Sequence, residues 1–156
     1  MFKKIILMLV LIFGFAIAPV NADELSDVQA FFENYIKAAN SYSKTLVNYY
    51  QPDAKIIRVV IKPDKTTQSV DFPMSRYKNE LRKSAPLARL SRYKNTYTDK
   101  KFEKLENGDY KISALRTPNN DKKGLPFHFI VTNTPDGWKV KEELMHTTVQ
   151  KFLNTK

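Results

Sequence analysis

The second half of the chain alternates between apolar and polar side chains, and this alternation constrains the fold more than any other feature. The alternating segments are 93–106, 109–116, 125–132 and 138–148. Asn107-Gly108 and Asp136-Gly137 each separate two of these segments, and such dipeptides favour the tight turns of β-hairpins. The pattern therefore predicts a meander of long antiparallel strands. Near Lys100-Lys101 the alternation slips, which indicates a β-bulge.

The first half begins with a helical pattern. Between residues 23 and 40 the apolar positions Leu25, Val28, Phe32, Tyr35 and Ala39 recur at helical spacing. They predict an amphipathic helix with one broad buried face. A second, short helix is expected over about 41–50, before Pro52. The β-branched run 55–62 predicts a strand, with 66–70 as its hairpin partner.

A third helix is expected to begin at Pro73, because proline suits the first turn of a helix. Pro86 disfavours the helical conformation at Ala85 and predicts that this helix ends there. Helices in front and a meander behind indicate an α+β domain, with the N-terminal helices packed on a curved antiparallel sheet.

The first 22 residues are typical of a secretory signal peptide. Lys3 and Lys4 precede an apolar run over 5–18, and the small residues Val20 and Ala22 fit a cleavage site. The run is shorter than the ~20 apolar residues that a spanning helix needs. An uncleaved membrane anchor is the alternative. We expect cleavage near Ala22 and a single mature domain, 23–156, in a bacterial periplasm or outside the cell.

The chain has no cysteine, which excludes disulfides, zinc–thiolate sites and thiol nucleophiles. His128 and His146 have no carboxylate at ligand spacing, so neither a metal nor any other cofactor is expected. His128 alternates with Phe127 and Phe129, and we expect it on the outer surface. The few glycines form no loop that would cradle a phosphate.

The chain is strongly basic, with a formal net charge of +10, and the basic residues are concentrated in one stretch. Between residues 76 and 104 ten Lys and Arg residues face three acidic ones. The expected basic face contains Arg76, Arg82, Arg89 and Arg92. A face of this kind attracts lipid headgroups, anionic envelope polymers or an acidic protein. It is also compatible with a solvated surface that has no partner. Export argues against nucleic acid.

Three segments resemble the NTF2-like (SnoaL-like) superfamily. They are the aromatic pair Phe31-Phe32 in the first helix, the stretch 46–57 with its Pro-Asp turn, and the closing hairpin 136–140. The resemblance implies a conical pocket between the helices and the concave face of the sheet. Members of the superfamily use this pocket as isomerases, dehydratases, cyclases and hydrolases, or only as a socket for a ligand or protein. The enzymes usually place an Asp, Tyr, His or Arg inside it.

The residues predicted to line such a pocket and bind a ligand are Tyr35, Tyr77, Tyr97 and Trp138; aromatic residues at these spacings are also typical of a plain core. On the last strand, Glu142 and His146 share a face with Trp138 and Val140, and they point toward the core or pocket if that face is the inner one. They are weak catalytic candidates, together with Asp99. Alternatively, Glu142 pairs with a basic neighbour such as Arg116, and His146 lies at the exposed end of the strand.

Three functions remain open from the sequence. The first is an exported, non-catalytic binding or accessory protein that holds an anionic or amphipathic ligand, or a partner protein, through the pocket or the basic face. The second is a small enzyme of the SnoaL or isomerase type. The third is an immunity or secretion-system protein that docks or dimerises through its sheet. Peripheral contact with a membrane is compatible with the basic face.

Overall fold

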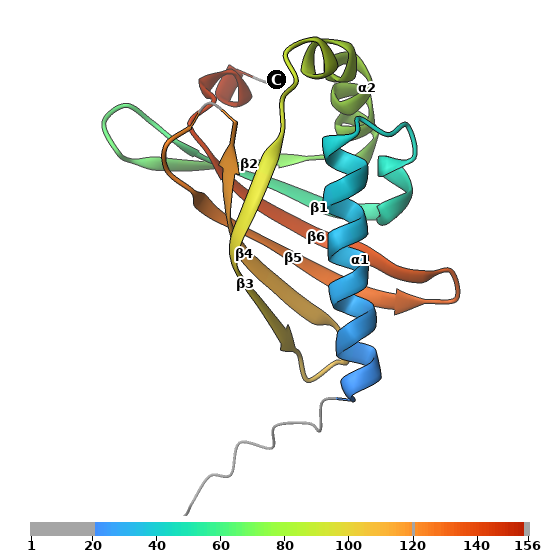
Figure 1. Ribbon diagram of the computed structural model, residues 1–156. Coiled ribbons are helices and arrows are strands. Elements are labelled where there is room, and N and C mark those ends of the chain that lie inside the picture. The colour runs from blue at the N-terminus through green and yellow to red at the C-terminus, as the bar shows by residue number, and fades with distance from the viewer. Residues whose placement is uncertain (1–20, 120, 155–156) are drawn as a thin grey trace, which may run out of the picture.

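The computed structural model describes residues 21–119 and 121–154, which form helices packed on one curved sheet (Figure 1). In chain order the elements are α1 (Ala22–Asn40), η1 (Leu46–Tyr49), β1 (Tyr50–Ile61), β2 (Thr67–Phe72), α2 (Met74–Leu90), β3 (Asn95–Lys104), β4 (Tyr110–Pro118), β5 (Leu125–Thr134), β6 (Gly137–Thr147) and η2 (Gln150–Asn154). The predicted signal peptide lies outside the described residues except for Asn21 and Ala22.

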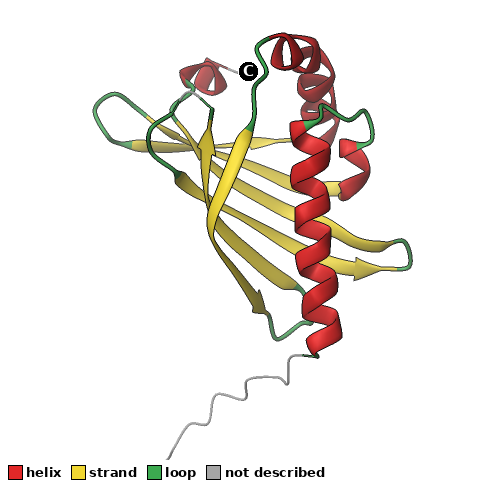
Figure 2. Cartoon of the chain, viewed as in Figure 1, coloured by secondary structure: helices red, strands yellow, loops and turns green. Residues whose placement is uncertain are grey.

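The sheet has the strand order β2-β1-β6-β5-β4-β3, and α1 runs across its concave face (Figures 1 and 2). Strands β3 to β6 form the predicted antiparallel meander. Strand β1 pairs with β2 antiparallel but with β6 parallel, so the sheet is mixed. After β2 the chain passes through α2 to β3, at the opposite edge of the sheet. Strands β3 to β6 then follow one another back across the sheet, so that β6 lies beside β1 and runs parallel to it. The α+β class with helices on a curved sheet is confirmed.

Both predicted hairpin turns are present, with Gly108 at φ +86° and Gly137 at φ +91°. A side chain rarely adopts this backbone region, which explains glycine at both positions. The predicted bulge in β3 is present as well, because the pairing with β4 shifts between Thr98 and Lys101. A second shift occurs between β5 and β6, where Lys141 has no partner opposite it.

Two of the predicted helix boundaries are wrong. The helix expected over 41–50 is only the short 3₁₀ helix η1, and β1 already begins at Tyr50. Helix α2 continues through Pro86 to Leu90. Pro86 lacks the N–H that would bond to the Arg82 carbonyl, but it is exposed, so water can hydrate that carbonyl.

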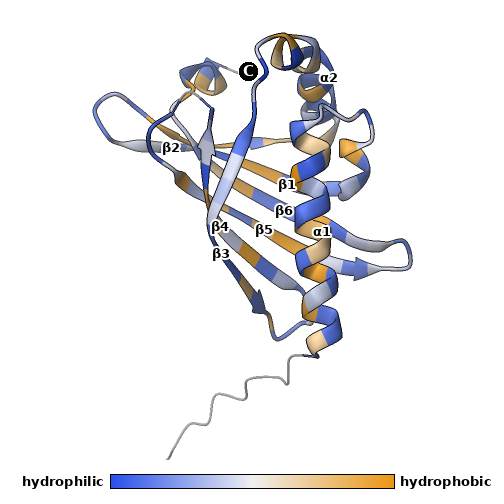
Figure 3. Ribbon diagram, in the orientation of Figure 1, coloured by the Kyte–Doolittle hydropathy of each residue, from blue (hydrophilic) through white to orange (hydrophobic). Residues whose placement is uncertain are grey.

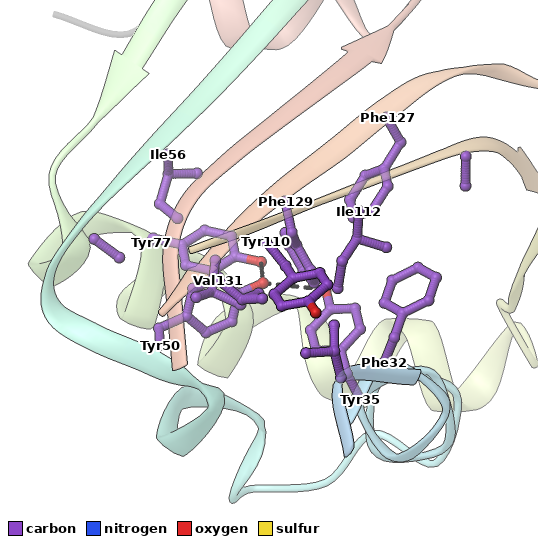
Figure 4. Packing of buried hydrophobic residues seen from close by; sticks show 14 of the residues in the cluster. Phe32, Tyr35, Tyr50, Ile56, Tyr77, Tyr110, Ile112, Phe127, Phe129 and Val131 are labelled. Carbon is purple, nitrogen blue, oxygen red and sulfur yellow. Dashed lines mark hydrogen bonds between the residues drawn. The ribbon is translucent and has the colours of Figure 1, made fainter. Parts of the chain in front are cut away.

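The core lies between α1 and the sheet and is rich in aromatic rings (Figure 4). Phe32 is fully buried, stacks on Phe127 and meets Tyr97, Phe102 and Phe129 edge to face. Figure 3 shows alternating apolar and polar bands along α1, as expected of a helix with one buried face.

Of the described residues, the four that precede Leu25 (21–24) contribute no side chain to this core. Asn21 caps α1, because its side chain accepts a hydrogen bond from the backbone N–H of Asp23. Among the described residues, the core is therefore formed by side chains from Leu25 to Phe152. None of the described helices combines the length and apolarity needed to cross a lipid bilayer.

Candidate functional site

Five polar side chains meet inside the cone, and we call them the interior polar cluster: Tyr35, Tyr50, Arg58, Tyr77 and Glu143. They come from α1, β1, α2 and β6, and each residue is at most 8% exposed. Figure 4 shows the rings of the three tyrosines converging beneath α1.

Strand β1 places Arg58 in the interior. Ile56, Arg58 and Val60 alternate on its buried face, so the guanidinium points into the cone between two aliphatic side chains. Its Cζ lies 5.4 Å from the centre of the Tyr77 ring, and Nη1 donates to the Ile57 carbonyl at 3.2 Å.

The bulge at Lys141 places Glu143 in the interior. Before the bulge Val140 is buried; after it the buried positions are Glu143 and Thr147. The extra residue exchanges the two faces of the strand. The prediction that Glu142 and His146 face inward is therefore wrong, because it extended the alternation of Trp138 and Val140 through the bulge.

The cluster is held by a continuous network of hydrogen bonds. Glu143 Oε1 lies 2.6 Å from Arg58 Nη2, and Oε2 accepts a short hydrogen bond from the Tyr50 hydroxyl. The hydroxyls of Tyr35 and Tyr77 each lie 3.1 Å from that of Tyr50. Because Tyr50 gives its one proton to Glu143, its oxygen accepts from Tyr35. Tyr77 also approaches Glu143 Oε2 at 3.5 Å.

Burial raises the pKa of Tyr35, Tyr50 and Tyr77 above the usual value, and the nearby Glu143 carboxylate raises each pKa further. Burial alone would lower the pKa of Arg58, but the attraction of Glu143 outweighs it and raises that pKa. The tyrosines are therefore neutral donors at physiological pH, and Arg58 is a buried cation.

The other two predicted pocket residues lie outside the cluster. Tyr97 packs edge to face on Phe32 and Phe127, and burial raises its pKa. Trp138 packs edge to face on Tyr110 and also lines an open groove outside the cone.

Described residues line that groove and a second open hollow, and both lie outside the cone. The first, of about 510 Å³, lies between α1, η1 and the β5–β6 hairpin. The second, of about 310 Å³, lies beside the bulge of β6 and includes Glu142. Between α1 and the sheet lie the packed rings of the aromatic core and the interior polar cluster.

The weak catalytic candidates are not brought together. Asp99 is exposed in the bulge of β3. Glu142 Oε1 lies 3.3 Å from Nε2 of His128 at the outer surface. His146 Nδ1 lies 3.2 Å from the carbonyl of Pro126.

The expected surface position of His128 is confirmed, since its side chain is partly exposed. The suggested partner of Glu142, Arg116, is wrong. Arg116 is buried and donates to the side-chain oxygens of Asn95 and Tyr93. Across residues 21–119 and 121–154, no three His, Asp or Glu residues are placed to hold a metal ion.

The arginines of the expected basic face lie on α2 or in the turn after it. The Arg76 guanidinium lies 4.7 Å from the centre of the Phe72 ring, and Arg82 donates to Asn79 at 2.8 Å. Arg82, Arg89 and Arg92 are exposed, and Arg76 is half-buried. None of the four forms an ion pair with a described carboxylate.

Sequence reasoning missed three residues of the interior polar cluster. For Arg58 the sequence does contain a signal of burial. It is the one charged residue in the run from Ile56 to Ile61, and in a strand it lies on the same face as Ile56. Tyr50 falls at the end of the helix that the sequence predicts over 41–50. For Glu143 no local signal marks the bulge, since Lys141 and Glu142 continue a polar run.

No family model matches this sequence, and no curated protein does. Solved structures do match in fold. A DUF3225-family protein of unknown function from Pectobacterium atrosepticum superposes with a TM-score of 0.60 at 17% identity, over 81% of this chain and 91% of that one. An NTF2-like protein of unknown function from Pseudomonas putida gives 0.61 at 11% identity, over 82% and 89%.

Aln2 from a Streptomyces species superposes with a TM-score of 0.59 at 8% identity, over 87% of this chain and 99% of that one. At such low identities the likeness concerns the fold alone. The chain has the NTF2-like fold, which confirms the fold that the sequence resemblance implied.

Proposed function

We propose that this protein is an exported binding protein, without a catalytic role, that holds an anionic partner on the basic face of α2. The observation that carries the proposal is the set of cations on and after this helix. Arg82, Arg89 and Arg92 are exposed and have no described carboxylate as partner. Lys78 and Lys83 extend the set along the same helix.

The packed aromatic interior supports an external site. In the cone, the position where this fold accommodates ligands is occupied by Phe32, Phe129 and the interior polar cluster. The Glu143 carboxylate already has Arg58 and Tyr50 as partners, and burial makes any loss of these partners expensive. A small molecule would have to displace well-packed rings to enter.

Charge complementarity then defines the partner. Unpaired arginines and lysines on one helix create a local positive potential that attracts anions and speeds their encounter. Arginine also forms paired hydrogen bonds with phosphate and carboxylate groups. The partner class is therefore an anionic polymer, an anionic lipid surface or an acidic protein.

Charge reversal tests the proposal. We expect Arg82→Glu/Arg89→Glu to weaken binding to immobilised polyglutamate or to phosphatidylglycerol vesicles by roughly tenfold or more. The control is Lys122→Glu/Lys123→Glu, which changes the net charge equally in the exposed loop before β5. If both variants weaken binding equally, the effect comes from the net charge alone, and the α2 face is not the binding site.

The interior polar cluster favours a second candidate function, a small enzyme of the SnoaL type. A carboxylate and three phenols within one cone are groups that acid–base catalysis uses. Native mass spectrometry of residues 23–156 purified from the envelope, followed by solvent extraction, separates the two. A bound small molecule that Tyr77→Phe releases would establish a ligand site in the cone, which the enzyme requires and the α2 site does not.

A further inference from the structure

Helix α2 has a second apolar surface that no described residue covers. Its inner side packs on the core through Met74, Tyr77 and Leu81. Leu87 and Leu90, near its end, are 69% and 83% exposed. Such exposure of two neighbouring leucines on one helix end is a feature that requires an explanation.

Helical spacing places these leucines together on the outer side. Lys83, Leu87 and Leu90 follow at i, i+4 and i+7, which is one stripe of a helix. The stripe is opposite the one formed by Tyr77 and Leu81. After Leu81 no residue of α2 belongs to the described core, so the apolar side chains of Leu87 and Leu90 at its end face solvent.

Cations flank the exposed leucines on one side. Arg82 and Arg89 (i, i+7) share the stripe on that side, Lys83 lies within the leucine stripe, and Arg92 follows in the turn after the helix, whereas Glu80 lies on the other side. No described carboxylate pairs with these four residues. Apolar side chains bordered by Lys and Arg on one helix face are typical of segments that lie on anionic membranes.

We propose that the end of α2 and its following turn, residues 82–92, dock on a membrane surface that contains anionic phospholipid. Leu87 and Leu90 enter the headgroup region, while the arginines bind lipid phosphates. This inference rests on the proposed function and names its partner. An acidic protein would satisfy the charges equally well, but two leucines this exposed favour an occupant with an apolar layer directly beneath its anionic groups.

The position of the segment in the fold permits this contact. The end of α2 is at the opposite end of the molecule from the start of α1, and apolar residues are visible on it (Figures 1 and 3). Two leucines bury little area, so binding is reversible and needs the cations as well. Removal of either group should release the protein.

Vesicle co-sedimentation tests the inference with residues 23–156, which include every described core residue. The vesicles are phosphatidylcholine alone, or phosphatidylcholine with phosphatidylglycerol. We expect binding to the anionic vesicles only. Leu87→Ser/Leu90→Ser should weaken it by roughly tenfold, since each leucine loses part of its burial free energy. The control, Leu115→Ser/Val149→Ser, removes two other exposed apolar side chains and should bind as the parent does.

A fluorescent label gives a second measurement. The chain has no cysteine, so Leu90→Cys provides a single site for an environment-sensitive dye. Its emission should shift to the blue on anionic vesicles, whereas a dye at Ser69→Cys on the exposed side of β2 should not respond.

The outcomes separate this inference from the proposed function. If charge reversal releases the vesicles but the leucine variant binds normally, the basic face stands and insertion of the leucines is wrong. If polyglutamate binds and vesicles do not, the partner is an anionic polymer or protein, and the membrane inference is overturned. If neither probe binds, both proposals fail.

Discussion

Arg58 and Glu143 form an ion pair between two parallel strands, with 2.6 Å between Nη2 and Oε1, and both side chains are buried. In the register of β1 on β6, Ile56 is opposite Glu143 and Arg58 is opposite Met145. The ion pair is therefore diagonal, and it forms only because the bulge at Lys141 turns Glu143 inward. The burial of this ion pair therefore depends on the bulge in the pairing of β6 with β5.

The first prediction concerns the contribution of this buried ion pair to the free energy of unfolding. Glu143→Gln leaves Arg58 as an unpaired buried cation, so we expect the free energy of unfolding to fall by about 3–5 kcal/mol. Arg58→Met/Glu143→Met removes both charges and should be more stable than Glu143→Gln. Urea denaturation measures both. Glu142→Gln is the matched control on the exposed side of the strand, with an expected loss below about 1 kcal/mol. Equal losses at positions 142 and 143 would contradict the buried position of Glu143.

The second prediction concerns alkaline pH. Burial raises the pKa of Tyr35, Tyr50, Tyr77 and Tyr97, each from an ordinary value of 10.0. The folded protein thus holds these protons more tightly than the unfolded chain. The corresponding stability is fully present below pH ~10 and is lost as the pH rises above it. Phenolate absorbance of these residues and loss of near-ultraviolet circular dichroism should appear in one cooperative transition.

Tyr35→Phe gives the control for that titration. It should remove one phenol from the cooperative transition and leave the transition otherwise intact, because Tyr35 is at the end of the hydrogen-bond network. A phenolate signal from the cluster that develops while the protein stays folded would show that solvent reaches the interior.

The elements were more predictable than the cluster. The spacing of Val28, Phe32 and Tyr35 predicted α1, and the glycines of the two hairpins predicted their turns, because each rule is local. The inward position of Glu143 depends on one extra residue in β6, and its effect is seen only in the pairing with β5. Alternation alone therefore assigned Glu142 and His146 to the wrong side.

The third prediction concerns the proline within α2. Pro86→Ala restores an N–H that can donate to the Arg82 carbonyl, so we expect the free energy of unfolding to rise by about 1–3 kcal/mol. Pro73→Ala is the control at the other end. Pro73 is the N-cap with extended backbone, so its replacement should change stability little and only downward. Thermal unfolding of both variants measures the contrast, and a neutral Pro86→Ala would mean that the helix ends before it.

The last prediction concerns Asp99, which the sequence offered as a weak catalytic candidate. Its φ of +52° lies in the left-handed region, at the bulge where β3 shifts against β4. Aspartate tolerates this conformation better than most residues, and a β-branched side chain does not. We expect Asp99→Val to lower the free energy of unfolding by about 1–2 kcal/mol, and Asp99→Gly to be neutral or slightly stabilising. Thr98→Val, at the neighbouring exposed strand position, should have little effect.

If the only role of Asp99 is to adopt this backbone conformation, Asp99→Gly will also bind polyglutamate and anionic vesicles as the parent does. Loss of binding in this stable variant would instead give the carboxylate a direct role.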